Sequence, residues 1–396
     1  MSEWKKCKLS DLGTVVGGAT PSTKNEENYE GGTIAWITPK DLAGYKRRYI
    51  MRGKRNITEK GLNSCSAQIL PANSILFSSR APIGYVAIAG QEMCTNQGFK
   101  SIIPNDDTDY MFLYYLLKYN KNKIESMGSG TTFKEVSGRT MKNIEVTVPN
   151  SLTEQRKIAS ILSVIDEKIE INEKINENLE QQCWNYFYDL FINNADSIWP
   201  KCTLSDIGSV VSGGTPSKSK LEYYTEKGIA WITPKDLSVN KSKFISHGEI
   251  DISELGFAKS NAQKLPAGTV LFSSRAPIGY IAIAQNVVTT NQGFKSIIPN
   301  KNIGTAYTYY LLKYLLPTIE AMGSGSTFKE ISGSVMKSVP TVMPDDSTLK
   351  NFTEFCEPIF RKQEILEIQN NYLTTIRNIL LPKIMSGELD ITKIRF

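Results

Sequence analysis

The side chains that could do chemistry in this chain are polar ones that occur twice at one fixed spacing, since Arg275 minus Arg80 is 195. Arginine suits bidentate hydrogen bonding to guanine, asparagine or glutamine suits adenine, and lysine suits a phosphate. The repeated candidates for contact with nucleic acid are Lys40, Arg80, Asn96, Gln97 and Lys134, then Lys235, Arg275, Asn291, Gln292 and Lys329. A recent duplication whose loops have not drifted would leave the same identities.

A basic segment adds Arg47 and Arg48 to the candidates. Residues 43–69 carry seven lysines and arginines against one acid, Glu59. Such a run is usually a solvated face, and phosphate contact is the alternative interpretation. The corresponding segment 238–264 has four lysines against three acids, so these segments are the most diverged pair.

Catalytic chemistry is not indicated by the sequence. The single histidine, His247, has Arg52 as its counterpart, so a histidine triad in both halves is impossible and a histidine-ligated metal is not expected. No phosphate-binding loop and no dinucleotide fingerprint occurs. Asp41 and Asp236 fit turn or helix caps better than catalytic groups. We therefore expect no catalytic residues, no bound cofactor and no metal.

Composition is that of an ordinary globular protein, with 40% hydrophobic and 22% charged residues and a net charge of +6. No apolar run approaches the ~20 residues that span a membrane, and the first residues lack the apolar core of a signal peptide. The six cysteines are scattered without a CxxC motif. These features predict a cytoplasmic protein with reduced thiols and no membrane contact.

The elements that must position these residues are two copies of one domain. Ile-Ala-Trp-Ile-Thr-Pro-Lys-Asp-Leu at 34–42 recurs whole at 229–237. Each copy has short β-type runs punctuated by proline and glycine, then a helix expected at about Asp109–Met127 in the first copy. This mixture predicts an α+β fold, with mixed α/β domains at 1–150 and 195–343 rather than a doubly wound sheet.

A long helical segment follows each domain, at 151–194 and at 344–396. The first has no Gly or Pro between Ser151 and about Asn193, and its apolar residues repeat every three to four positions, with Asn172 and Asn176 at seam positions. The second has a stripe at Phe352, Phe355, Ile359, Leu366, Leu373, Ile376 and Leu380, with Pro358 near its start and Gly387 at its end. Pairing as an antiparallel coiled coil would bury both stripes. Each helix packing separately on its own domain is the alternative.

Antiparallel pairing would relate the two domains by a pseudo-two-fold axis, which is the symmetry of two inverted half-sites on B-DNA. A helix of about 40 residues spans ~60 Å, which limits the separation of the half-sites. If the identical loops read the bases, the target is palindromic or nearly so. If segments 43–69 and 238–264 read them, the half-sites differ.

Four strings of residues resemble one known family. They are the opening Trp-Lys-Lys-Cys-Lys-Leu-Ser-Asp-Leu-Gly (4–13) with its counterpart 199–208, Gly-Gly-Thr-Pro-Ser (213–217) with Trp-Ile-Thr-Pro-Lys-Asp-Leu (231–237), Pro-Asn-Ser-Leu-Thr-Glu-Gln-Arg-Lys-Ile (149–158), and Leu-Leu-Pro-Lys-Ile-Met-Ser-Gly-Glu-Leu (380–389). The chain resembles, over essentially its whole length, the specificity subunit of type I restriction–modification enzymes. The first copy departs from the pattern with Gly-Gly-Ala-Thr-Pro, and the second helix lacks the Glu-Gln start.

The resemblance implies two target-recognition domains spaced by paired helices, and a bipartite double-stranded DNA target. It also implies two modification (methyltransferase) subunits that bring S-adenosylmethionine, and restriction subunits that bring ATP and Mg²⁺. The cofactors would belong to those partners. Trp184, Tyr186 and Phe187 could face partners or fill a core. The alternatives are a single-chain DNA-modifying enzyme and a two-domain protein-binding scaffold.

Overall fold

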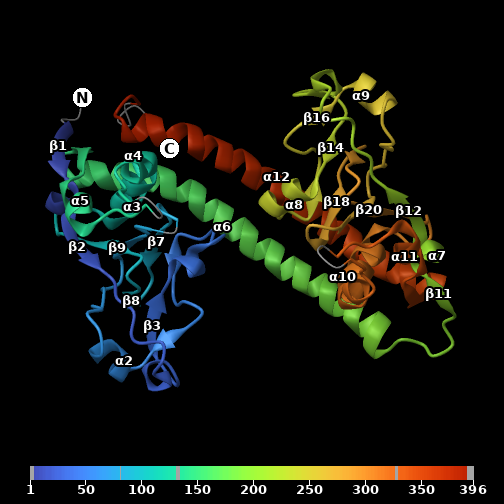
Figure 1. Ribbon diagram of the computed structural model, residues 1–396, viewed down its shortest axis with the longest axis horizontal. Helices are drawn as coiled ribbons and strands as arrows, with labels where there is room; N and C mark the ends of the chain where they lie inside the picture. Colours follow the sequence, from blue (N-terminus) through green and yellow to red (C-terminus); the bar gives the residue numbers. More distant parts are fainter. Residues whose placement is uncertain (1–3, 81, 131–133, 326–328, 390–396) are drawn as a thin grey trace. The chain divides into compact units, whose positions relative to one another are not determined.

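The computed structural model describes residues 4–80, 82–130, 134–325 and 329–389. The outermost residues of the first predicted domain and of the second helical segment, 1–3 and 390–396, lie outside this range. The chain forms two compact units, one of residues 1–171 with 370–396 and the other of residues 172–369. The two long helices, green (α6) and red (α12) in Figure 1, therefore contribute to both units.

A mixed five-stranded sheet organises the first unit. Its neighbours are antiparallel except β4 and β7, which are parallel. In order across the sheet the strands are β2 (Gly13–Gly17), β9 (Lys100–Pro104), β6 (Ile75–Phe77), β7 (Val86–Ala89) and β4 (Tyr49–Ile50). Smaller sheets join β1 (Trp4–Lys8) to β10 (Glu145–Pro149), and β5 (Asn56–Ile57) to β3 (Ile34–Ile37) and β8 (Cys94–Thr95).

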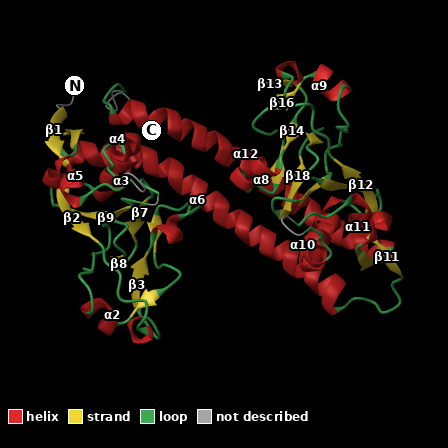
Figure 2. Cartoon of the chain, viewed as in Figure 1, coloured by secondary structure: helices red, strands yellow, loops and turns green. Residues whose placement is uncertain are grey.

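Short helices complete the first unit (Figure 2). They are α1 (Leu9–Leu12), η1 (Glu26–Asn28), η2 (Pro39–Leu42), α2 (Glu59–Asn63), α3 (Tyr110–Tyr119), α4 (Lys121–Ser126) and α5 (Gly138–Asn143). The sequence predicted one helix at 109–127, and the structure has two there, because α3 ends at Tyr119 and α4 begins at Lys121. Asp109 caps α3 by accepting a hydrogen bond from the Phe112 amide at 2.8 Å.

The second unit repeats this topology. Its five-stranded sheet runs β12 (Gly208–Ser212), β20 (Lys295–Pro299), β17 (Val270–Ser274), β18 (Ile278–Ala284) and β15 (Phe244–Ile245). The pairs are β11 (Lys201–Thr203) with β21 (Pro340–Val342), β13 (Tyr224–Thr225) with β16 (Asp251–Ile252), and β14 (Trp231–Ile232) with β19 (Thr289–Thr290). Its short helices are α7 (Leu204–Ile207), η4 (Leu221–Tyr223), α8 (Pro234–Val239), α9 (Glu254–Ala258), α10 (Thr305–Ala321) and α11 (Gly333–Ser338). The α+β prediction is confirmed.

Both long helices form close to where the sequence places them. Helix α6 runs Leu152–Tyr188 and continues as a π-helical stretch, Asp189–Asn193, and α12 runs Asp346–Met385 through Pro358. Gly387 follows α12 with a φ of 76°, a conformation that glycine adopts most readily.

The helices are antiparallel within each unit. In the first unit, Arg377 donates to Asp166 at 2.8 Å, and Asn370 donates to the Ile169 carbonyl at 3.3 Å. In the second unit, Gln363 donates to the carbonyl of Asn176 at 3.2 Å. Asn172 is fully buried, and its side-chain amide donates to the side-chain oxygen of Gln369 at 3.3 Å. The two asparagines therefore lie at the seam, as the sequence predicted.

The buried face of α12 differs from the predicted stripe in two places. Phe355 and Ile376 are 40% and 46% exposed, so their assignment to the buried stripe was wrong. In the second unit Phe352 and Leu366 are buried as predicted, together with Leu349, Cys356, Phe360 and Gln363. Steps of three and four keep these residues on one helix face, and Phe355 lies just beside it.

The core of each unit joins the domain to the helices. In the second unit Phe187 is fully buried, and Trp184 and Tyr186 pack against the same cluster. Core packing is therefore the role the structure gives these three aromatic residues. Across the described residues, no helix is long and apolar enough to cross a membrane.

Candidate nucleic-acid interface

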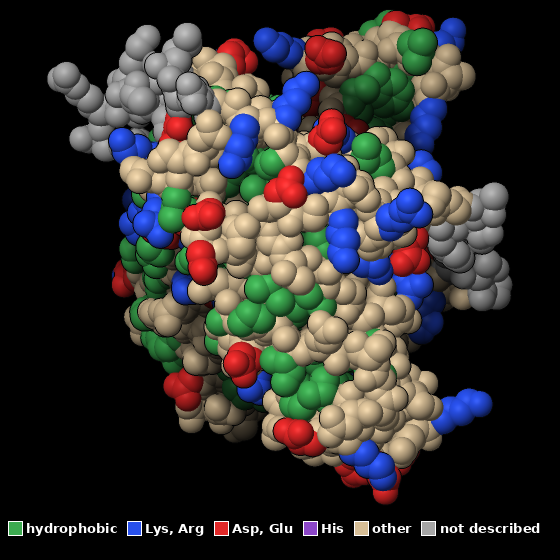
Figure 3. All heavy atoms as spheres, turned by 90° about the vertical axis from the view of Figure 1, so that its left-hand side faces the viewer, with side chains coloured by type: hydrophobic (Ala, Val, Ile, Leu, Met, Phe, Trp, Pro, Cys, Tyr) green, Lys and Arg blue, Asp and Glu red, His purple; other side chains and the backbone are tan. Residues whose placement is uncertain are grey.

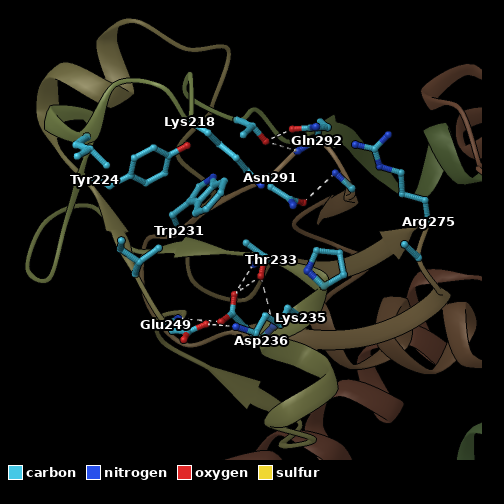
Figure 4. Close-up of a pocket in the computed structure, with 16 residues that line it drawn as sticks. Lys218, Tyr224, Trp231, Thr233, Lys235, Asp236, Glu249, Arg275, Asn291 and Gln292 are labelled. Atoms are coloured by element: carbon cyan, nitrogen blue, oxygen red, sulfur yellow. Dashed lines mark hydrogen bonds and ion pairs between the residues drawn. The ribbon is translucent and has the colours of Figure 1, made fainter. Parts of the chain in front are cut away.

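Four of the five candidates in the second half line one pocket of about 590 Å³. They are Lys235, Arg275, Asn291 and Gln292. In Figure 4, Tyr224, Trp231 and Asn291 follow one another across the pocket, Gln292 and Arg275 lie toward its far side, and Lys235 closes it below. Residues far apart in the sequence thus line one pocket.

Strand order explains this convergence. Strands β14 and β19 are parallel, with Ile232 opposite Thr290. Parallel strands end at the same edge, so the start of helix α8, which carries Lys235, lies beside the loop that carries Asn291 and Gln292. In the first unit β3 and β8 are also parallel, with Ile37 opposite Thr95. Lys40, Asn96 and Gln97 come together there by the same rule.

The Asn-Gln-Gly turn has a fixed shape in both units. The Asn291 side-chain oxygen accepts a hydrogen bond from the Gly293 amide at 2.9 Å, and Asn96 does the same for Gly98. Asparagine thus holds the turn, and only part of its amide is left for a ligand. Gln292 is exposed and hydrogen-bonds Thr215, as Gln97 does Thr20.

Arg275 is held loosely at the opposite wall. Its guanidinium lies 3.4 Å from a carboxylate oxygen of Glu330, and both side chains are more than a third exposed. Arg80 and Glu135 form the same pair at 3.5 Å. Exposed pairs of this kind contribute little to stability, about 0–1 kcal/mol. Each guanidinium therefore keeps donors that can exchange a carboxylate for a base edge or a phosphate.

Asp236 lines the pocket and acts as a structural residue at the start of α8. One carboxylate oxygen accepts from the amide and the hydroxyl of Thr233, at 2.7 and 2.6 Å, and the other accepts from the Glu249 amide at 2.8 Å. In the first unit Asp41 makes the same bonds to Thr38 and to the Lys54 amide. The prediction that these aspartates are caps is confirmed.

Two aromatic residues form the remaining wall, and the sequence reasoning did not single them out as site residues. The Trp231 indole donates to the Gly214 carbonyl at 3.0 Å, and the Tyr224 hydroxyl donates to the Pro216 carbonyl at 2.7 Å. The two rings meet edge to face at 5.7 Å. Trp36 and Tyr29 repeat the arrangement at 5.9 Å. The signal was present in the repeat, where both rings recur at the same spacing.

Arg48 does not join this surface. It is 3% exposed, and its guanidinium donates to both carboxylate oxygens of Glu170, at 3.2 and 3.0 Å, and to the Ser163 carbonyl at 3.4 Å. Burial lowers the pKa of Arg48, but the hydrogen bond and the charge of Glu170 raise this pKa by a larger amount, so the group stays charged. The predicted phosphate contact does not fit this position, because the charge is already neutralised inside the protein. Arg47, next to it, is half-buried.

Lys243 is the counterpart of Arg48 and is buried in the same way. Its ammonium group donates to Glu180 at 2.8 Å, to Gln363 at 2.9 Å and to the Tyr310 hydroxyl at 3.1 Å. Burial raises the pKa of Glu180, but Lys243 and Lys313 lower it more, to about 2. In each unit this buried basic residue fastens the domain to the long helices.

Lys134 and Lys329 are exposed but do not line the pocket. Each directly follows residues outside the described range, 131–133 and 326–328. On the face drawn in Figure 3, Lys and Arg side chains are more frequent toward the right-hand edge than elsewhere. Among the described residues, no three His, Cys, Asp or Glu side chains gather as a metal site would require.

Comparison with known proteins agrees with this duplicated architecture. A family model described as "Type I restriction modification DNA specificity domain" matches residues 1–181 and again 197–381. The chain belongs to this family. Its members are recognition subunits of type I restriction–modification systems and not catalysts, so the expectations of family and of a non-catalytic role are confirmed.

Relatives match this specificity-family chain from end to end. The specificity subunit of the type I restriction enzyme MjaIX, from Methanocaldococcus jannaschii, is 35% identical, and the match covers 99% of this chain and 95% of that protein. The HindI specificity subunit of Haemophilus influenzae is 22% identical over 98% of this chain and 100% of that one. A solved type I S subunit from M. genitalium has the same fold, with a TM-score of 0.62, 20% identity, and coverage of 97% and 96%.

Proposed function

We propose that this chain reads a bipartite double-stranded DNA target, one half-site with each repeat. The domains at 1–150 and 195–343 are the readers, and the segments at 151–194 and 344–396 are the spacers. One observation carries the proposal: the same arginine, glutamine, lysine and aromatic side chains stand around the same turn in both units. A duplicated reader fits a target with two related halves.

The proposed division of roles follows from the chemistry of each group. Arg80 and Arg275 suit a base edge because a guanidinium presents a planar fork of donors. Gln97 and Gln292 are exposed at the tip of a rigid turn, so they suit a base as well. Lys40, Lys134, Lys235 and Lys329 are exposed and suit phosphates. Because these residues match between the repeats, we expect a palindromic or nearly palindromic target.

The proposal includes two modification subunits and the restriction subunits as partners, which bring S-adenosylmethionine, ATP and Mg²⁺. The long helices carry exposed apolar residues suited to such docking. They are Val164, Ile171 and Ile175 on α6, and Ile365, Ile368, Tyr372 and Ile379 on α12. Exposed apolar side chains of this kind mark protein-binding surfaces when they gather on one element.

Methylome sequencing of a host with and without this chain tests the proposal. Loss of one bipartite methylated motif on deletion is the expected result, and an unchanged methylome would refute it. Arg80→Ala and Arg275→Ala then form a matched pair. Each should relax one half-site only, at a cost of ~1–3 kcal/mol. DNA modification by the purified chain alone would point instead to a single-chain enzyme.

A further inference from the structure

Sixteen residues line the pocket of the second repeat, and the first repeat has a different residue type at four of these positions, here called the rim. At twelve of the sixteen lining positions the second repeat has the residue found 195 places earlier, as at Trp231 and Trp36. The rim residues are Lys218, Leu221, Glu249 and Ile250 in the second repeat, and Thr23, Glu26, Lys54 and Arg55 in the first. Among the lining positions, divergence is thus limited to these four.

In the second repeat the rim has two apolar residues, Leu221 and Ile250, and two residues of opposite charge, Lys218 and Glu249. The Lys235 ammonium lies 2.6 Å from a Glu249 carboxylate oxygen, with both side chains about 70% and 69% exposed. Leu221 is 82% exposed and Ile250 is 40% exposed. Two large apolar side chains that line the pocket are thus exposed to solvent.

In the first repeat the rim has no apolar residue, and it carries two basic residues, Lys54 and Arg55, against one acid, Glu26. Lys54 stands where the second repeat has Glu249, so position 54 offers Lys40 no carboxylate. The Arg55 guanidinium lies over the ring of Tyr29, 3.5 Å from its centroid. Tyr29 is itself fixed by a hydrogen bond from its hydroxyl to the Pro21 carbonyl at 2.7 Å. A guanidinium stacked on a fixed ring is oriented before any ligand arrives.

These two surfaces suit different bases. A planar, oriented guanidinium matches the two acceptors on the major-groove edge of guanine, whereas leucine and isoleucine match the methyl group of thymine. We propose that the rim sets the one position at which the two half-sites differ. Arg55 selects guanine there in the first half-site, and Leu221 with Ile250 selects thymine in the second. This inference rests on the proposed function, and the identical walls read the bases that the halves share.

Exchanging the rims tests it in the full chain, expressed with its modification subunits. In the second repeat the exchange is Lys218→Thr, Leu221→Glu, Glu249→Lys and Ile250→Arg. Methylome sequencing should then show a motif whose second half has become the mirror of the first, with thymine replaced by guanine. The reciprocal exchange in the first repeat, Thr23→Lys, Glu26→Leu, Lys54→Glu and Arg55→Ile, should convert the other half.

Single substitutions keep the inference testable if an exchanged chain fails to fold. Arg55→Lys keeps the charge but loses the fork, so methylation at guanine should lose at least tenfold of its preference. Ile250→Arg should add guanine acceptance to the second half alone. A motif that depends on the chain but is unchanged by these substitutions, or a wild-type motif that is already a perfect palindrome, overturns the inference. If no motif depends on the chain, the proposed function itself fails.

Discussion

Replacing Arg48 by methionine separates a structural role for this residue from a DNA-binding role. The substitution keeps the aliphatic stem but removes three hydrogen bonds, two to Glu170 and one to the Ser163 carbonyl. It also removes the ion pair with Glu167 at 3.5 Å. Glu170 would keep the hydrogen bond from the backbone amide of residue 48. Its partly buried carboxylate would lose the charge of Arg48.

The expected loss of unfolding free energy is ~2–4 kcal/mol. Removing one partner of a buried ion pair typically costs about 3–5 kcal/mol, because the other charge is left uncompensated. The Glu170 side chain is 17% exposed, so water relieves part of that cost. Arg52 is exposed in the same basic segment, and Arg52→Ala should change the unfolding free energy by less than about 0.5 kcal/mol.

Hydrogen exchange of peptides from residues 34–57 measures the stability of the first unit separately from the second. A salt titration of DNA binding by the assembled complex is the second readout. The slope of log K against log salt is negative, and loss of one phosphate contact makes it less steep by about 0.9. We expect Arg48→Met to leave that slope unchanged.

Two results would contradict this reasoning. One is an Arg48→Met chain of unaltered stability whose salt slope falls, which would make Arg48 a phosphate contact after all. The other concerns the double variant Arg48→Met with Glu170→Met. The reasoning fails if its loss of unfolding free energy equals the sum of the losses in the two single variants. In such a double-mutant cycle, purely additive effects mean that the two side chains do not interact.

Three further predictions concern single residues. Glu180 has a folded-state pKa of about 2 against its ordinary 4.5. The unfolding free energy should therefore fall as the pH drops through that window, by at most ~3 kcal/mol. In urea denaturation at a series of acid pH values, Glu180→Gln should show a smaller pH dependence. Asp236→Ala removes the cap of α8 and should lower stability by ~1–2 kcal/mol in urea denaturation, without changing the salt slope of DNA binding. Gly18→Ala places a Cβ 2.0 Å from the Asn96 carbonyl oxygen, whereas Gly17→Ala meets only a side-chain carbon at 4.0 Å. Methylome sequencing should therefore show relaxed specificity in the first half-site for Gly18→Ala and unchanged specificity for Gly17→Ala.

The candidate site could be predicted in part because its chemistry lies in side-chain types. Arg275, Asn291 and Gln292 were identifiable from their repeat, and they do line one pocket. Arg48 was not separable from the exposed lysines around it. From the sequence alone, a basic residue in a basic segment is expected to be exposed to solvent. The partner of Arg48, the partly buried Glu170, lies on a helix more than a hundred residues later.

The helices show a similar division. Their length and their apolar spacing are local properties, so Leu152–Tyr188 and Asp346–Met385 lie close to the predicted spans. Which apolar residues face inward is not local. Phe355 satisfies the helical spacing as well as Cys356 does, yet only Cys356 is buried. The rotation of the helix about its axis depends on what the opposing surface accepts.

The sequence by itself determined that one domain occurs twice, that each copy is followed by a long amphipathic helix, and which family the chain belongs to. These properties follow from residue identity and short-range periodicity, which the chain carries whether or not it is folded. Only the tertiary structure decided which polar residues share a surface, because that depends on parallel pairing of strands such as β14 and β19. It also decided that Arg48 and Lys243 are internal fastenings, since burial is a property of the packed chain. The repeated loops thus line one pocket in the second unit, and four of its sixteen lining positions differ from the first repeat.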